Sequence, residues 1–145
     1  MLHVASCSGE LGVVDYLVGD PDLLDLDMAA DLECRCAWGP HRGATPLWMA
    51  SRHGHEHVVR FLLDCGASLE WAHGDDGLPP ALHEATRRGR LEVVQALTQS
   101  KADPWTRDHQ GATPFLVACR QGEQGIAACL ISREAASSRK GQERE

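Results

Sequence analysis

Apolar residues recur along this chain at helical spacing, in short blocks that end at glycine. In the segment Gly43–Gly66, Thr45 precedes Pro46, which is the arrangement of an N-cap followed by proline at the first helical position. Gly54 is placed to end this first helix, and valines and leucines at helical spacing predict a second helix from about His57. Each predicted helix is shorter than the roughly 12–15 residues at which an isolated helix becomes marginally stable, so the pair requires neighbours of its own kind.

The same helix–glycine–helix pattern occurs four times, with the other copies at 2–18, 81–97 and 113–131. All four copies share an alanine in the first helix, followed by the turn glycine. The alanines are Ala5, Ala50, Ala85 and Ala118, and the glycines are Gly9, Gly54, Gly89 and Gly122. Their spacings are 45, 35 and 33 residues, so the chain is an array of repeats with extra residues after the first copy.

This pattern resembles the ankyrin repeat, whose signature T-P-L-H-x-A recurs about every 33 residues. Gly-Ala-Thr-Pro stands at 43–46 and 111–114, and G-x-x-x-V-V stands at 9–14, 54–59 and 89–94. The resemblance covers nearly the whole chain apart from the insertion after the first copy and the last dozen residues. It implies an all-α fold, an ankyrin-repeat solenoid of stacked helix-turn-helix units with projecting hairpin loops.

The resemblance implies an ankyrin-repeat domain at 1–133. The tail at 134–145 is charged and has no apolar residue larger than alanine, so we expect it to be disordered, with a helix extension through Glu134–Ala136 as the alternative. Within the domain we expect repeats at about 1–20, 43–75, 76–110 and 111–132, with an insertion at 20–42. The insertion is acidic and contains several leucines, so it is either a loop or a short extra helix packed on the array. The first copy lacks the Thr-Pro turn, which indicates either a fragment of a longer array or a short natural protein whose first helix frays.

Two departures from the family pattern concern single residues. The motif histidine is present as His3 and His83 but is replaced by Trp48 and Leu116, so we expect its hydrogen bond between turns to be lost in two copies. Trp48 is then expected to pack in the interior. Lys101 stands where a glycine that closes a helix is expected.

Composition narrows the class of protein. The 145 residues carry a formal net charge of −7, which argues against a general nucleic-acid binder. No apolar run approaches the about 18 residues of a membrane span, and no signal peptide is recognisable, so neither nucleic acid nor membrane is expected as a partner. Cys7, Cys65, Cys119 and Cys129 fall on repeat helices, where cysteine acts as a small buried hydrophobe. A reducing cytoplasmic or nuclear location, or both, follows as the expectation.

The sequence contains no recognisable catalytic motif, and we expect neither an enzyme nor a cofactor. His53, Glu56 and His57 resemble a zinc-binding helix only loosely, because Gly54 interrupts the helix between the two histidines. Cys34, Cys36 and His41 are a second candidate ligand set, which makes a metal-binding insertion at 34–41 an alternative function. A structural zinc site uses four ligands and a fourth is not evident, so thiols in a mobile loop are the simpler interpretation.

A protein-binding surface has more support. In repeats of this kind the two residues before each turn glycine lie on the exposed end of the first helix and face the concave side. Stacking is therefore expected to align arginines in a ladder spaced by roughly 10 Å, and arginine suits the recognition of carboxylates or phosphates. The alternative is that these arginines only increase solubility, or that they pair with Glu84 and the acidic insertion. The predicted ladder consists of Arg52, Arg87, Arg88 and Arg120, and the neighbouring His53 and Gln121 are also expected to bind the partner.

The segments between helix pairs supply a second predicted surface, because tryptophan and arginine are enriched where interfaces concentrate binding energy. These hairpin-tip residues are Trp38, Arg42, Trp71, His73, Asp75, Asp76, Trp105, Arg107, Asp108 and His109. Together the two surfaces predict a non-enzymatic scaffold or adaptor that binds a peptide or domain, with acidic groups of the partner meeting the arginines. The segment 43–59 after a long insertion also resembles the array of Fem-1 proteins, which implies a substrate-recognition subunit of a ubiquitin ligase as an alternative.

Overall fold

The computed structural model describes residues 2–19, 32, 35–36, 42–69 and 78–132. These residues form paired helices and contain no strand. The helices are α1 (Leu2–Ser8), α2 (Leu11–Gly19), α3 (Pro46–His53), α4 (Glu56–Asp64), α5 (Ala81–Arg87), α6 (Leu91–Gln99) and α7 (Pro114–Gln121), followed by a helix over residues 124–132. Most of the insertion at 20–42 and the tail at 134–145 lie outside the described residues.

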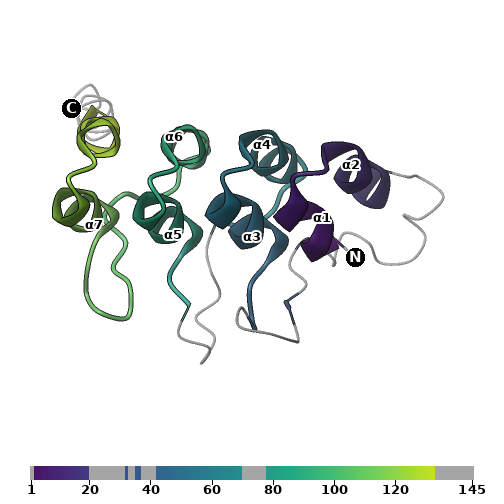
Figure 1. Ribbon diagram of the computed structural model, residues 1–145, viewed down its shortest axis with the longest axis horizontal. Coiled ribbons are helices and arrows are strands. Elements are labelled where there is room, and N and C mark those ends of the chain that lie inside the picture. The colour runs from purple at the N-terminus through teal and green to yellow at the C-terminus, as the bar shows by residue number, and fades with distance from the viewer. Residues whose placement is uncertain (1, 20–31, 33–34, 37–41, 70–77, 133–145) are drawn as a thin grey trace, which may run out of the picture.

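The helix pairs stack in sequence order as two parallel layers. Figure 1 shows α1, α3, α5 and α7 in one row and α2, α4 and α6 in the other, from the purple N-terminal end to the green C-terminal end. Each helix contacts its counterpart in the next pair, α1 with α3, α3 with α5, α5 with α7, and likewise α2 with α4 and α4 with α6. The predicted all-α solenoid is confirmed.

Local signals explain where the inner helices begin and end. The hydroxyl of Thr45 accepts a hydrogen bond from the Trp48 N–H at 3.2 Å, and proline occupies the first turn of α3. At the other end Gly54 has φ +83° and its N–H donates to the Ala50 carbonyl, which is a left-handed C-cap. Thr113 and Gly122 repeat this arrangement around α7. Short helices are thereby given defined ends, and stacking supplies the remaining stability.

The core lies between the layers and between successive pairs. Ala50, Ala85 and Ala118 are fully buried, because a methyl side chain lets adjacent inner helices approach closely. The outer helices contribute valines, leucines and one isoleucine. These fully buried residues are Val14, Val58, Val59, Leu62, Val93, Val94, Leu97, Ile126 and Leu130. Leu32 of the insertion is also buried and belongs to this core.

One ring nitrogen in each of the first three pairs reaches the turn before the next pair. His3 Nε2 lies 3.0 Å from the Ala44 carbonyl oxygen, and His83 Nε2 lies 2.9 Å from that of Ala112. Trp48 is buried, and its Nε1–H donates to the Pro79 carbonyl at 2.9 Å. The expected loss of this hydrogen bond at Trp48 is therefore wrong, because an indole N–H serves the same purpose as the imidazole. Its predicted packing in the interior is confirmed.

Three further positions qualify the expectations. Lys101 follows α6 with φ +71°, so a lysine occupies the left-handed conformation that glycine normally adopts. Cys65 and Cys119 are exposed, and Cys65 comes after the last residue of α4; neither is the small buried hydrophobe that was expected.

In the described part of the chain no helix combines the length and apolar character needed to cross a membrane.

Candidate functional site

The C-terminal ends of α1, α3, α5 and α7 form a row that we call the ridge. Figure 1 shows the inner helices side by side, and each contacts the next. The two residues before each turn glycine therefore come into register along the array. His53, Arg88, Arg120 and Gln121 are exposed there, and Arg52 and Arg87 are half-buried. The ridge consists of Cys7, Ser8, Arg52, His53, Arg87, Arg88, Arg120 and Gln121.

A buried glutamate organises the middle of the ridge. The side chain of Glu84 on α5 is only 3% exposed, although it is surrounded by charged groups. Its Oε1 accepts from Nη1 of Arg52 and, at 3.0 Å, from Nε of Arg88. Arg87 Nη1 lies 3.6 Å from Glu84 Oε2. One carboxylate therefore binds three arginines from two successive helix pairs.

Further contacts orient two of these arginines. The guanidinium of Arg52 lies over the Trp48 ring, with Cζ 5.5 Å from the ring centroid, which is the geometry of a cation–π interaction. Arg87 Nη2 lies 3.7 Å from Asp108 Oδ2, and the Arg87 carbonyl accepts from Gln121 Nε2 at 3.0 Å. Arg120 is exposed and makes no side-chain hydrogen bond or ion pair with the described residues. The ladder thus has three arginines paired with a carboxylate and one, Arg120, without such a pair among the described residues.

The role of Glu84 was underestimated from the sequence, where it appeared only as an alternative partner. Its position corresponds to Val4, Met49 and Val117 in the other copies, so a charged residue stands in an apolar column. Arg87 and Arg88 follow it by three and four residues, the spacing at which side chains meet on one helix face. Those two signals together indicate an ion-pair centre.

The hairpin-tip set is only partly described. Trp38, Trp71, His73, Asp75 and Asp76 lie outside the described residues. The other members are Arg42, Trp105, Arg107, Asp108 and His109, of which all but Asp108 are exposed. The Trp105 ring packs at a tilt against Phe115, with centroids 6.1 Å apart, so part of its surface stabilises the segment before α7.

Asp108 departs from the expected exposure, because it is 8% exposed. Its Oδ1 accepts from the N–H groups of Gln110 and Ala112, both at 2.9 Å. Burial alone raises the pKa of the Asp108 carboxyl, but these two backbone hydrogen bonds bring the net pKa below its usual value. Asp108 therefore holds the turn together as a carboxylate and does not present that group at a tip.

His83, on the buried side of the same turn, is fully buried, and its Nδ1 has no hydrogen-bond partner among the described residues. Burial lowers the pKa of His83. The Ala112 and Thr106 carbonyls and the Asp108 carboxylate raise this pKa by smaller amounts, and the Arg87 charge lowers it. The Ala112 carbonyl can only accept, so Nε2 carries a proton. Because Nδ1 has no partner among the described residues and the pKa is lowered, the folded protein favours the neutral imidazole with its proton on Nε2.

We expect the free energy of unfolding to decrease as the pH falls below about 6.5, the ordinary histidine value. Between the lowered folded-state pKa of His83 and 6.5, the unfolded chain binds a proton that the folded chain does not. Stability is therefore lost with decreasing pH, by at most about 1.4 kcal/mol per pH unit. Urea unfolding at pH 7.5, 6.5 and 5.5 measures this slope. His83→Gln should flatten it, whereas His57→Gln, at an exposed histidine, should not; equal slopes for wild type and His83→Gln would contradict the assignment.

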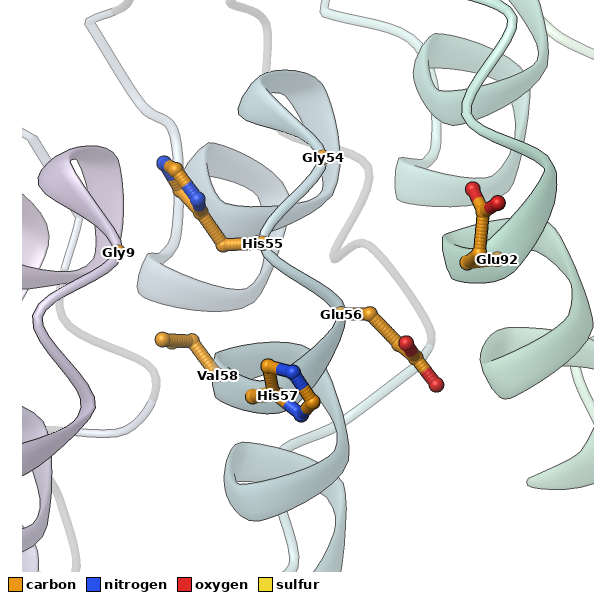
Figure 2. Close-up of a pocket in the computed structure, with 7 residues that line it drawn as sticks. All are labelled: Gly9, Gly54, His55, Glu56, His57, Val58 and Glu92. Carbon is orange, nitrogen blue, oxygen red and sulfur yellow. The ribbon is translucent and has the colours of Figure 1, made fainter.

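A shallow hollow lies between the turns of the first three helix pairs. It has a volume of about 240 Å³ and is lined by Gly9, Gly54, His55, Glu56, His57, Val58 and Glu92. Figure 2 shows the His55 ring directed toward Gly9, while the Glu56 side chain extends in the opposite direction, toward the helix that carries Glu92. Small-molecule sites typically occupy about 300–1,000 Å³ and are mostly apolar, and this hollow is smaller and polar.

The two metal candidates have different outcomes. His53, Glu56 and His57 do not converge, because Glu56 pairs with Arg60 at 2.6 Å and His53 contacts Cys7. Within the described ranges no three potential ligands are grouped around a common point. Cys34 and His41 lie outside those ranges, so the candidate at 34–41 stays a hypothesis.

Comparison with known proteins agrees with the geometry. A family model described as ankyrin repeats matches residues 2–108 in three copies. Protein phosphatase 1 regulatory subunit 27 of Mus musculus is 44% identical over 77 residues, which are 53% of this chain and 49% of that protein. Tyrosine-protein kinase Shark of Drosophila melanogaster is 33% identical over 90 residues, 62% of this chain and 10% of the kinase. Protein fem-1 homolog A-like of Mus musculus is 37% identical over 105 residues, 72% of this chain and 15% of that protein. The chain thus spans at most about half the length of these relatives.

Proposed function

We propose, from the premise that this chain belongs to the ankyrin-repeat family, that it is a non-enzymatic module that binds an acidic peptide or domain surface along the ridge. The repeats of this family support protein interaction in general, and the choice of the ridge and of an acidic partner is the proposal. The exposed hairpin-tip residues Arg42, Trp105, Arg107 and His109 would form the edge of the same surface.

The observation that carries the proposal is the anchoring of three arginines on one buried carboxylate. A surface arginine normally loses rotamer freedom when it binds a partner, and this loss weakens binding. Arg52, Arg87 and Arg88 are already restrained by Glu84, so less freedom remains to be lost. Arg87 and Arg88 nevertheless keep 37% and 44% of their side-chain surface exposed. Restrained guanidinium groups with exposed edges suit the binding of carboxylates.

Loss of charge on the ridge tests this proposal. We expect a variant with Arg88→Gln and Arg120→Gln to retain few of the proteins that wild type captures, measured by affinity purification and quantitative mass spectrometry. Both residues are exposed, and Arg52 and Arg87 still pair with Glu84 in the variant, so it should keep its fold. Lys101→Glu changes charge at an exposed position after α6 and is the matched control that should bind normally. If the double variant captured every wild-type partner at full level, the ridge would not be the surface that binds them.

A substrate-recognition subunit of a ubiquitin ligase is the second candidate. It is favoured by the similarity to protein fem-1 homolog A-like, which extends over 72% of this chain. The same purification distinguishes the two, because a ligase receptor should co-purify with other ligase subunits whether or not the ridge is altered. An adaptor would show no such ligase subunits.

A further inference from the structure

A thiol and an imidazole meet at the N-terminal end of the ridge. Cys7 Sγ on α1 lies 3.3 Å from His53 Nε2 on α3, a distance that fits a hydrogen bond to sulfur. Cys7 is half-buried and His53 is exposed, so a reagent from solution can reach the pair. The two residues come from successive helix pairs, and the contact exists because stacking places α1 beside α3.

His55 holds both members of the pair in place. Its Nε2 donates to the Cys7 carbonyl oxygen at 2.8 Å, and its ring stacks on that of His53 with centroids 6.2 Å apart and planes 13° apart. His55 also lies against the backbone of Gly9, since a Cβ built there would stand 2.4 Å from His55 Nδ1. His55 therefore contacts both the backbone of Cys7 and the ring of His53, and it restrains the positions of the thiol and the imidazole.

We propose that Cys7 and His53 form a reactive thiol site whose substrates are small-molecule disulfides. The thiolate is the nucleophile of cysteine chemistry, and an adjacent imidazole can accept the thiol proton. The Cys7 proton passes to His53 Nε2, and the sulfur then attacks one sulfur of the disulfide. A new S–S bond forms at Cys7 while the original S–S bond breaks, and the other half leaves as a thiolate. The disulfide is the only oxidant that the step consumes.

Two other cysteines of the chain provide internal comparisons. Cys65 is exposed at its surface, but partial desolvation of its thiol, followed by the nearby carboxylates of Asp64 and Asp15, raises its pKa and disfavours the thiolate. Cys119 on α7 is exposed and has no imidazole contact among the described residues. Reaction at Cys7 is therefore expected to be faster than at either of them, although its own thiol is less exposed.

The rates at individual cysteines test this site. The full chain is treated at pH 7.0 with limiting 4,4′-dipyridyl disulfide, quenched at intervals, and mapped by peptide mass spectrometry. We expect Cys7 to be modified first. His53→Gln should slow Cys7 by about threefold or more, an effect limited because a more abundant thiolate is also a weaker nucleophile.

The controls decide between a paired and an ordinary thiol. His57→Gln alters an exposed histidine on α4 and should leave the Cys7 rate unchanged. The Cys119 rate in each sample is the internal reference for reagent activity, because this thiol is exposed and its rate should be the same in all three proteins. A Cys7 rate that is unaffected by His53→Gln, or one no faster than that of Cys65, would overturn the proposal.

Discussion

Replacing Trp48 by alanine is expected to lower the free energy of unfolding by about 4 kcal/mol. The indole is 1% exposed and is the largest fully buried side chain among the described residues. Alanine would leave a cavity and would also remove the donor to the Pro79 carbonyl, an acceptor that is costly to leave unpaired in the interior. The cation–π contact with Arg52 would be lost as well. Urea unfolding followed by circular dichroism measures the change.

Two substitutions at the same position separate packing from hydrogen bonding. Trp48→Phe keeps a large ring without the N–H, so we expect a loss of about 1–2 kcal/mol from the unpaired Pro79 carbonyl. Trp48→His introduces the residue that bonds to the next turn in the first and third copies, and should keep the hydrogen bond while losing volume. An alanine variant as stable as wild type would show that Trp48 does not link α3 to the turn before α5.

Most of the fold could be predicted because several short sequence signals each specify one backbone conformation. Thr45 before Pro46 specifies where α3 begins, and Gly54 specifies where it ends. The alanine column then predicts which helices lie side by side, since helices of seven to nine residues persist only when packed. Agreement among capping, spacing and apolar pattern explains why the solenoid was recognisable.

The outcome at Trp48 shows what such signals omit. A motif comparison counts tryptophan at this position as a missing histidine, because it compares residue types. It does not consider whether the new side chain places an N–H donor at the same acceptor. Whether an indole N–H meets a carbonyl depends on where the following turn lies, and here the acceptor is 31 residues away in sequence. Long-range geometry of this kind is not encoded in local pattern.

The position of the ridge could also be predicted, but the contacts of its side chains could not. The two residues before each glycine were correctly placed at the ends of inner helices, but the state of the arginines was left open between free and paired. Arg52 and Glu84 are 32 residues apart, so their contact follows only from stacking. Asp108 likewise resembled an exposed turn residue until its carboxylate was seen to accept two backbone N–H groups.

Substitution of Glu84 is expected to have the second largest effect on stability. Glu84→Ala removes a carboxylate that is 3% exposed and leaves three guanidinium groups without their shared partner. Breaking a buried ion pair costs about 3–5 kcal/mol, and we expect a loss of about 3 kcal/mol, at the low end, because Arg87 and Arg88 are exposed enough to be hydrated. Urea unfolding at low and high salt measures it.

Glu56→Ala is the matched control, because Glu56 also accepts from an arginine four residues later, at 2.6 Å, but is 27% exposed. Such surface pairs contribute about 0.3–0.5 kcal/mol, so burial is the variable that differs between the two glutamates. Glu84→Met supplies the side chain found at the equivalent Met49, which refills the volume without the charge. If Glu84→Ala cost no more than Glu56→Ala, the three arginines would be held by something other than this carboxylate. The argument that they are restrained before a partner binds would then fail as well.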